Sequence, residues 1–408
     1  MNPTIKARIE SIRRGEVPEG YKRTKIGIVP NEWGEERLKH YFKRLTRKNS
    51  EKNQNVLTIS AQYGLISQEE FFNKSVASED KSNYFLLNKG DFAYNKSYSN
   101  GYPYGAIKRL EYYEKGIVSP LYICLESLQE KTSDYFVQYF EAGLLNKEIH
   151  AVAQEGARNH GLLNIAVEDF LNSRVVVPKI PEQEKIAEIL AGQDRVIALK
   201  EKLLAEKQKQ KKYLMQQLLT GKKRLPGFSG EWKKVLLDEL VQISTGNKNT
   251  QDQIVNGSYP FFIRSDEVCR INSYSFDGEA ILIPGEGKIG EIFHYINGKF
   301  DYHQRVYKIS DFACNGKYIF YYLQAFFKKR ALSMSAKATV DSLRREMLTG
   351  MDINLPSLKE QTAIAEILST ADKEIELLKK DIEQEKLKKK SLMQLLLTGI
   401  VRVDELVS

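Results

Sequence analysis

The sequence between residues 178 and 224, PKIPEQEKIAEILAGQDRVIALKEKLLAEKQKQKKYLMQQLLTGKKR, recurs between residues 356 and 402 as PSLKEQTAIAEILSTADKEIELLKKDIEQEKLKKKSLMQLLLTGIVR. The two stretches align without a gap at an offset of 178, and they share IAEIL, LMQ and LLTG. Similar helical composition alone does not produce identity at this level. One structural module is therefore used twice in the chain.

Each copy predicts a long amphipathic helix whose apolar residues form one narrow stripe. They recur every seven positions, the period of a coiled coil, at Leu190, Ile197, Leu204 and Leu218 and at Leu368, Ile375, Ile382 and Leu396. Gly221 and Gly399 follow the last turn, where glycine commonly ends a helix. At about 1.5 Å per residue, a helix of roughly 38 residues spans about 55 Å. We expect the helices to pack antiparallel through the Leu190 and Leu368 stripes, with a pseudo-two-fold axis relating the repeats.

The segments outside the repeats predict two β-rich globular domains, and so an α+β fold. They are rich in aromatic residues, glycine and short alternating runs, and each begins near a Glu-Trp pair that contains Trp33 or Trp232. We expect an N-terminal segment (residues 1–26), a first globular domain (27–178), a central helix (179–224), a second globular domain (225–356) and a C-terminal helix (357–408).

The composition favours a polyanionic partner. The 408 residues include 62 Lys and Arg against 53 Asp and Glu, a formal net charge of +9, together with 22 Tyr and 18 Phe. Simple solubility is the alternative explanation. Cys124, Cys269 and Cys314 are far apart and odd in number, which indicates neither a zinc ribbon nor a disulfide framework. The sequence has no apolar run of about 18 residues and no signal-peptide core, so we expect a cytoplasmic protein.

The stretch AILIPGEGKIGEIFHYI (residues 280–296) contains Gly285, Gly287 and Gly290 in the spacing G-x-G-x-x-G. A dinucleotide site needs a helix after these glycines. Because EIFHYI alternates with the period of a strand, we expect a strand, a glycine turn and a second strand, without a cofactor. NKGDFAYNKSYSNGYPYGAI (residues 88–107) follows a similar plan in the first domain.

The same stretch also carries the D…E-x-K pattern of metal-dependent nucleases, at Asp277, Glu286 and Lys288. A nuclease needs its Glu and Lys fixed on a rigid strand around the metal. Glu286 instead lies between two glycines, where a turn is expected. A free-standing nuclease is therefore kept as the alternative to a non-catalytic function.

Together these features resemble the specificity subunit of type I restriction-modification enzymes. The resemblance covers nearly the whole chain and is carried by the doubled P…EQ..IAEIL…LMQ.LLTG helices and by the strands GDFAYNKS and ILIPGEGKIG. It implies a non-catalytic subunit in which each globular domain recognises one half of an asymmetric, bipartite site in double-stranded DNA. It also implies that the helices set the half-site spacing and dock two DNA methyltransferase subunits, with restriction and translocase subunits completing the assembly.

The sequence contains no catalytic motif for these reactions. It has no Pro-Pro pair, and so lacks the [DN]-P-P-[FYW] motif of adenine methyltransferases, and it lacks the G-x-x-x-x-G-K-[ST] motif of ATP-driven motors. The five histidines are scattered without metal-ligand spacing. We therefore expect no catalytic residue, no metal and no cofactor.

Polar loops in each globular domain supply the residues expected to contact DNA. Asn and Gln can read adenine, Arg can read guanine, Glu can accept from cytosine and Lys can bind phosphate. In the first domain they are Asn95, Lys96, Tyr98, Asn100, Arg158, Asn159 and His160. In the second they are Glu286, Lys288, Gln304, Arg305, Lys337, Thr339, Ser342 and Arg344. As alternatives, the loop tyrosines, Tyr102 and Tyr104 above all, pack on their own sheet, and Arg344 begins a solvated helical turn.

The helix ends are expected to bind the methyltransferase subunits. They carry more apolar surface than the coiled-coil stripe requires, at Leu214, Met215, Leu218, Leu219, Leu392, Met393, Leu396 and Leu397. The alternative is that these ends pack on the adjoining globular domains. The basic stretches at residues 207–212 and 386–390 are mixed with Gln and Glu, which favours solvated or subunit-contacting surfaces over DNA binding.

Overall fold

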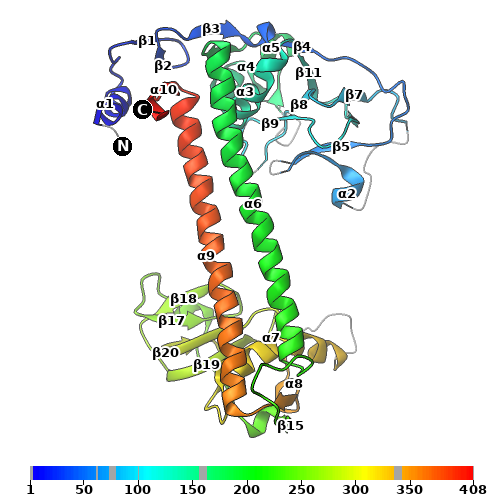
Figure 1. The fold of residues 1–408 in the computed structure, drawn as a ribbon, viewed down its shortest axis with the longest axis vertical. Helices are drawn as coiled ribbons and strands as arrows, with labels where there is room; N and C mark the ends of the chain where they lie inside the picture. The colour runs from blue at the N-terminus through cyan, green and yellow to red at the C-terminus, as the bar shows by residue number, and fades with distance from the viewer. Residues whose placement is uncertain are drawn as a thin grey trace. The chain divides into compact units, whose positions relative to one another are not determined.

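The computed structural model describes residues 3–60, 63–72, 80–99, 101–155, 163–334 and 342–407. The chain divides into two compact units, the first made of residues 1–199 and 383–408 and the second of residues 200–382. Each unit contains one β-rich globular domain and part of each long helix, α6 (Ile180–Leu218) and α9 (Leu358–Leu396) (Figure 1). Within the described ranges, no helix is long and apolar enough to cross a membrane.

Ion pairs between α6 and α9 establish that the two helices run antiparallel. In the second unit, successive lysines of α6 pair with residues that lie progressively earlier in α9. Lys200 pairs with Asp381 (2.8 Å), Lys207 with Glu374 (2.7 Å) and Lys211 with Asp372 (2.5 Å). The first unit has the same order, in the pairs Glu182–Arg402 and Asp194–Lys389, both at 2.6 Å. The antiparallel coiled coil predicted from the repeat is confirmed.

The pseudo-two-fold symmetry extends to single ion pairs. Asp194 and Asp372 differ by the repeat offset of 178, and so do their partners Lys389 and Lys211. The two lysines are the non-apolar members of the seven-residue stripes, and their side chains are only 16% and 17% exposed. Each therefore places a charge in the helix seam and binds it to the facing helix.

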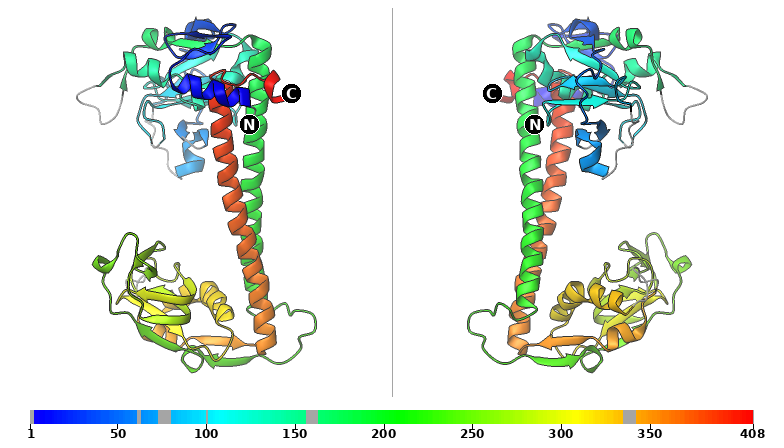
Figure 2. Two further views of the ribbon diagram at one scale, coloured as in Figure 1. Left: turned by 90° about the vertical axis from the view of Figure 1, so that its left-hand side faces the viewer. Right: turned by 90° about the vertical axis from the view of Figure 1, so that its right-hand side faces the viewer.

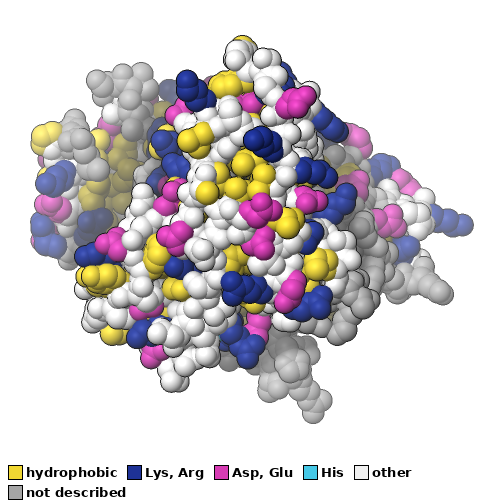
Figure 3. Space-filling model, turned by 90° about the horizontal axis from the view of Figure 1, so that it is seen from below, with side chains coloured by type: hydrophobic (Ala, Val, Ile, Leu, Met, Phe, Trp, Pro, Cys, Tyr) yellow, Lys and Arg dark blue, Asp and Glu magenta, His cyan; other side chains and the backbone are white. Residues whose placement is uncertain are grey.

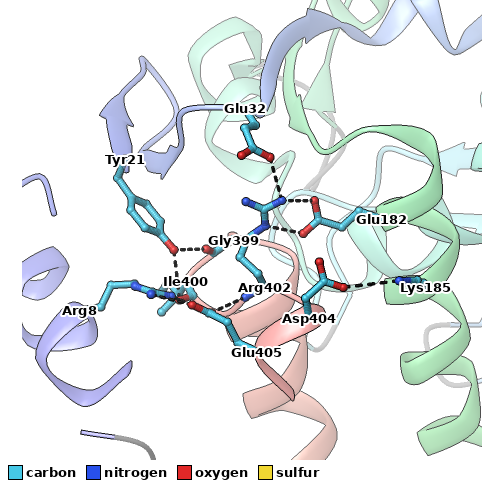
Figure 4. A network of polar contacts seen from close by, with 10 residues as sticks. All are labelled: Arg8, Tyr21, Glu32, Glu182, Lys185, Gly399, Ile400, Arg402, Asp404 and Glu405. Carbon is cyan, nitrogen blue, oxygen red and sulfur yellow. Dashed lines mark hydrogen bonds and ion pairs between the residues drawn. The ribbon is translucent and has the colours of Figure 1, made fainter. Parts of the chain in front are cut away.

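A glutamate near the start of each long helix is bound by the arginine that follows the other helix. Arg402 donates through Nε and Nη2 to Glu182 (2.6 and 2.9 Å), and Arg224 donates through the same two atoms to Glu360 (2.7 and 2.8 Å). In the first unit Arg402 also donates to Glu32 at 3.2 Å, so that it lies between two carboxylates (Figure 4). These bidentate bonds tie the beginning of each helix to the backbone that follows the other.

The two ends of the chain meet in the first unit. The N-terminal helix α1 (Pro3–Arg13) lies beside the C-terminal end of α9 and the short helix α10 (Asp404–Val407) (Figure 2). Arg8 donates to both carboxylate oxygens of Glu405 and to the carbonyl of Ile400, each at 2.8 Å. The N-terminal segment is therefore fastened to the backbone that follows α9.

The first globular domain is built on an antiparallel sheet of order β4–β11–β8–β9, against which α3 (Glu130–Glu141) packs. Its strands are β4 (Phe42–Arg44), β8 (Phe92–Asn95), β9 (Ala106–Arg109) and β11 (Ile123–Ser127). Two-stranded sheets surround it: β1 (Tyr21–Arg23) with β2 (Ile28–Pro30), β3 (Gly34–Arg37) with β14 (Arg174–Val177), β5 (Leu57–Ser60) with β6 (Gly64–Ser67), β7 (Phe85–Asn88) with β10 (Lys115–Val118), and β12 (Gln154–Glu155) with β13 (Leu163–Asn164). The remaining helical segments are η1 (Leu38–His40), α2 (Gln68–Phe72), α4 (Asn146–Val152) and α5 (Val167–Leu171).

The second globular domain has a six-stranded sheet of order β16–β21–β19–β20–β17–β18, in which β17 and β20 pair in parallel and the other neighbours are antiparallel. Its strands are β16 (Gln242–Thr245), β17 (Tyr259–Phe262), β18 (Val268–Ile271), β19 (Phe276–Pro284), β20 (His294–Tyr302) and β21 (Val306–Ser310). A separate pair joins β15 (Lys233–Leu236) to β22 (Asp352–Leu355). The helical segments are η2 (Leu237–Glu239), η3 (Thr250–Asp252), α7 (Gly316–Ser333), which lies alongside the sheet (Figure 2), and α8 (Arg345–Thr349).

The apolar ends of the long helices lie inside the two cores. Leu218 and Leu219 are buried in the core of the second unit, and Met393, Leu396 and Leu397 in that of the first. Leu214, Met215 and Leu392 are half-buried against the same cores. The prediction that these positions form exposed apolar patches is therefore wrong. The last turn of each helix docks on the globular domain of its own unit and leaves little apolar surface free.

Leu190 and Leu368 allow a paired test of the symmetric core. Both are fully buried, one in each unit, at equivalent positions of the repeat. Replacing either with Ala should lower the free energy of unfolding of its unit by about 3 kcal/mol, because the side chain is fully buried and its removal leaves a cavity in the core. Hydrogen exchange and chemical denaturation measure this change. The controls are Leu199→Ala and Leu377→Ala, at equivalent positions that are 61% and 66% exposed. Each should change the free energy of unfolding by less than about 0.5 kcal/mol.

Candidate nucleic-acid interface

The glycine stretch forms a turn between two paired strands. It joins β19 to β20, which pair antiparallel from Phe276 opposite Phe300 to Leu282 opposite His294. Gly290 has a φ of +73°, and a Cβ there would lie 2.8 Å from the Cα of Lys328 in α7. The predicted sequence of strand, turn and strand is confirmed. The chain after these glycines continues into β20 and not into a helix, so the turn lacks the strand–turn–helix frame of a dinucleotide site.

Backbone hydrogen bonds join this turn to two other loops of the second unit, and join one of these loops to the turn after β16 and to the end of β17. The amide of Gly285 donates to the carbonyl of Arg305, and the amide of Leu343 donates to the carbonyl of Gly285, both at 2.8 Å. The amide of Gln304 donates to the carbonyl of Lys248 (2.8 Å), and that of His303 to Phe262 (2.9 Å). Polar residues that are up to 95 positions apart in the sequence therefore converge at one edge of the sheet.

Two arginines from different loops share one carboxylate there. Nη1 of Arg264 lies 2.9 Å from Oε2 of Glu286, and Nη1 of Arg305 bonds to Oε1 of the same carboxylate. The hydrogen bond from Arg264 and the charge of Arg305 lower the pKa of Glu286. We call Arg264, Glu286 and Arg305 the arginine cluster. Both carboxylate oxygens of Glu286 accept from arginines, so this carboxylate holds Arg264 and Arg305 together, and a contact with cytosine stays a prediction.

The residues behind the cluster keep it in place. The His303 side chain is buried, and its Nδ1 accepts from the amide of Arg305 at 3.0 Å. Burial, and then the charges of Arg264 and Arg305, lower the pKa of His303, so the ring stays neutral beside two cations. Gln304 is exposed and donates through Nε2 to Oδ1 of Asn249 at 2.6 Å.

The other residues expected to contact DNA in the second domain lie on the same loops. Lys288 is exposed, two positions after Glu286. Ser342 forms an isolated backbone bridge with Glu286, and Arg344 is exposed and donates to the carbonyl of Met334 at 3.0 Å. Lys337 and Thr339 lie outside the described residues. The structure thus brings Glu286, Lys288, Gln304, Arg305, Ser342 and Arg344 onto neighbouring loops.

Arg264, Lys248 and Asn249 join this surface but were absent from the sequence-based set. Arg264 follows β17 in FFIRSDE, and the other two lie in the turn after β16. A cation after a strand is a common pattern that carries little information by itself. Their significance comes from the strand order, which places β17 beside β20 and the turn after β16 beside His303.

In the first domain the corresponding surface follows β8. Asn95 ends β8, and its Oδ1 accepts from the amide of Ser97 at 3.1 Å. The carbonyl of Lys96 accepts from the amide of Leu163, and Tyr98 is 64% exposed. Asn100, Arg158, Asn159 and His160 lie outside the described residues. This surface presents an amide, a lysine and an aromatic ring, whereas the second domain presents paired arginines.

Two tyrosines of the first-domain loop pack on their own unit. The hydroxyl of Tyr102 donates to Glu141 of α3, and the ring of Tyr104 lies 5.5 Å from that of His150. Gly105 lies so close to β8 that a Cβ there would be 2.2 Å from the carbonyl oxygen of Asn95. The alternative interpretation, that these tyrosines pack on the domain, holds for both of them.

The structure gives no support to the nuclease alternative. Asp277 lies at the start of β19 and Glu286 lies beyond its other end. The seven residue steps from Asp277 to the end of this strand alone span about 23 Å, so the two carboxylates do not meet at one metal. In the part of the chain that the structure describes, no group of three or more His, Cys, Asp or Glu is placed to hold a metal ion.

The basic excess of the chain is not concentrated on the helices. On the face in Figure 3, the coloured Lys and Arg are interspersed with Asp and Glu. Within the basic stretches, Lys207, Lys211 and Lys389 pair with carboxylates of the facing helix. These pairs support the interpretation that the stretches serve helix packing and the solvated surface, so the loop surfaces are the stronger candidates for DNA contact.

Comparison with known proteins gives one consistent result. A family model described as the type I restriction modification DNA specificity domain matches residues 30–208 and 229–386. The type I restriction enzyme EcoDI specificity subunit of Escherichia coli is 35% identical over 154 residues, which are 38% of this chain and 34% of that relative. The MjaVIII specificity subunit of Methanocaldococcus jannaschii is 27% identical over 330 residues, 72% of this chain and 76% of the relative.

Two solved structures share the fold at low sequence identity. The S subunit of a type I restriction-modification system from M. genitalium has a TM-score of 0.58 and 14% identity, covering 89% of this chain and 96% of that one. A chain from a study of complex assembly and conformational transition of the type I R-M system has a TM-score of 0.55 and 17% identity, covering 91% and 99%.

The environment of His303 predicts a pH dependence. Its pKa lies below the usual 6.5 in the folded protein, so the unfolded state binds the proton more readily. The stability from the neutral ring is complete above about pH 6.5 and decreases as the pH falls towards the folded-state pKa. An NMR titration of the ring should give a midpoint below 6.5, and His303→Gln should reduce the slope of stability against pH between about pH 7 and 5.5. A midpoint at or above 6.5 would contradict this.

Proposed function

The chain belongs to the type I restriction-modification DNA specificity family, and on this premise we propose that it is the subunit that recognises an asymmetric, bipartite DNA site. Each globular domain binds one half-site, and partner subunits carry out methylation and cleavage. The observation that carries the proposal is the pairing of two different polar loop surfaces, one in each unit, with one repeated helical frame. A protein that acts on cellular and incoming DNA in this way works in the cytoplasm.

The difference between the two loop surfaces supports an asymmetric target. Side chains select bases by their donor and acceptor pattern in the major groove, so a surface with Asn95 and Lys96 and a surface with paired arginines favour different bases. The helical frame is pseudo-symmetric, but the recognition surfaces are not. The two half-sites should therefore differ, unlike the palindrome that a symmetric dimer recognises.

The anchoring of each domain to the helices supports a fixed spacing. In the first unit, Gln138 of α3 donates to Asp194 (3.0 Å), the residue that also binds Lys389. In the second unit, Tyr321 of α7 donates to Asp372 (2.9 Å), which binds Lys211. Each aspartate thus joins a globular domain to both helices of its unit. Helices of 39 residues are about 58 Å long, enough to separate two major-groove faces that recur every 34 to 36 Å or so.

A methylome comparison tests this function. Cells that express the chain with its methyltransferase subunit should methylate adenines at one asymmetric bipartite sequence, and cells that lack either component should not. Exchanging residues 30–178 for the same region of another family member should change one half-site and leave the other unchanged, because each domain is anchored within its own unit. Methylation without this chain, or a change in both half-sites, would contradict the proposal.

We also propose that the exposed faces of the long helices dock two methyltransferase subunits. Leu199 of α6 and Leu377 of α9 are 61% and 66% exposed and are related by the repeat offset. Because the two positions are equivalent in the repeat, a partner that contacts one of them should contact the other in a second copy. Leu214, Met215 and Leu392, which are half-buried, remain candidate partner contacts.

Single charge substitutions test the docking surface. Leu199→Asp and Leu377→Asp should each lower the number of bound methyltransferase subunits from two to one, as measured by mass determination of the purified complex. Both side chains are exposed, so the variants should remain folded, which circular dichroism checks. Lys212→Asp and Lys390→Asp, at exposed and equivalent positions, are the controls. Two bound subunits in both leucine variants would exclude this surface.

A further inference from the structure

We propose that the arginine cluster of the second domain reads guanine, so that the half-site bound by this domain contains at least one G·C pair contacted by Arg264 or Arg305. The inference rests on the proposed DNA-recognition function and specifies the chemistry of one half-site. It is carried by the geometry of Arg264, Glu286 and Arg305, which hold two guanidinium groups at the edge of the sheet.

The two arginines keep most of their donors free for a base. Each is held to Glu286 through Nη1, and their side chains are 46% and 59% exposed. A guanidinium has five N–H groups in a fixed planar arrangement, so Nη2 and Nε remain available on each. The major-groove edge of guanine presents two acceptors, O6 and N7, which such a pair of donors matches.

Glu286 prepares the arginines for this contact. Without the carboxylate, the two cations would repel each other and their long side chains would sample many rotamers. With it, each guanidinium is oriented before DNA arrives, which lowers the entropy lost on binding. The structure therefore assigns Glu286 as a positioning residue for both arginines.

The loops that carry the cluster have little freedom to move. The amide of Gly285 bonds to the carbonyl of Arg305, and a Cβ on Gly285 would lie 2.8 Å from that oxygen. Gly287 has a φ of +82°, which L side chains rarely adopt. Nδ1 of the buried His303 accepts a hydrogen bond from the amide of Arg305. Each guanidinium is thus anchored to the end of a sheet strand, as discrimination between bases requires.

The charge of the site favours a base over a phosphate. Glu286 neutralises one of the two cations, and Asp266 and Glu267 are exposed next to Arg264. Carboxylates at these positions repel a phosphate, but a neutral base edge carries no such charge. Lys288, exposed on the adjoining turn, is better suited to the backbone because lysine binds phosphate as a point charge.

The test uses the complete complex with methyltransferase and the site found by methylome sequencing. Probes are duplexes of that site in which each base pair is replaced in turn. For the unaltered complex, replacing one guanine in the second half-site should weaken binding about 5- to 150-fold. Arg264→Ala or Arg305→Ala should abolish this discrimination while leaving that of the first half-site unchanged. Arg305→Lys keeps the charge but loses the planar donors, so it should lose discrimination like Arg305→Ala.

Two further variants make the result decisive. Glu286→Gln should weaken the discrimination for guanine. Lys288→Ala should weaken binding to all probes equally and reduce the slope of the logarithm of the binding constant against the logarithm of the salt concentration by about one. The inference is overturned if the second half-site contains no guanine. It is also overturned if Arg264→Ala and Arg305→Ala reduce binding uniformly, or if Arg305→Lys keeps full discrimination. Failure of the unaltered complex to select any sequence would instead refute the proposed function, and the inference with it.

Discussion

The fold depends on the bond between a glutamate at the start of each long helix and an arginine that follows the other helix. Gly221 and Gly399 both adopt a φ of +70° and turn the chain, so that Arg224 and Arg402, three residues later, reach back to the opposite helix. Each helix end is thereby tied to the beginning of its partner. The same bonds hold the start of each helix beside the backbone that follows the other.

The symmetric frame carries different neighbours at its two ends. In the second unit, Trp232 donates its indole N–H to Glu360 at 3.2 Å, and the guanidinium of Arg224 lies 5.4 Å from the Trp232 ring. In the first unit Arg402 instead bonds to Glu32 as well as Glu182, and α1 and α10 add a further layer. The arginine–glutamate bond is common to both repeats, and the residues around it differ between the two domains. A repeated module can therefore support two domains of unlike sequence.

The sequence predicts the parts of the structure that depend on periodic or local signals. The seven-residue stripe gives the helices and their antiparallel packing, and the alternation in EIFHYI gives the strand after the glycine turn. The burial of Leu219 and Leu397 agrees with the alternative interpretation of the helix ends and not with the preferred one, because amphipathicity shows that a face is apolar but not what covers it. The arginine cluster was also missed as a unit, since Arg264 reaches Glu286 only through the order of strands in the sheet.

The lysines in the helix seam show how such a frame resists slippage. A purely apolar stripe with a seven-residue period fits its partner almost as well after a shift of one repeat, whereas a charge within the stripe specifies register. Lys211 and Lys389 are largely buried and each needs its aspartate, so a shifted pairing would leave these charges without partners. The two Lys–Asp pairs therefore specify the register of the two helices within each unit, and the apolar stripe supplies the stability.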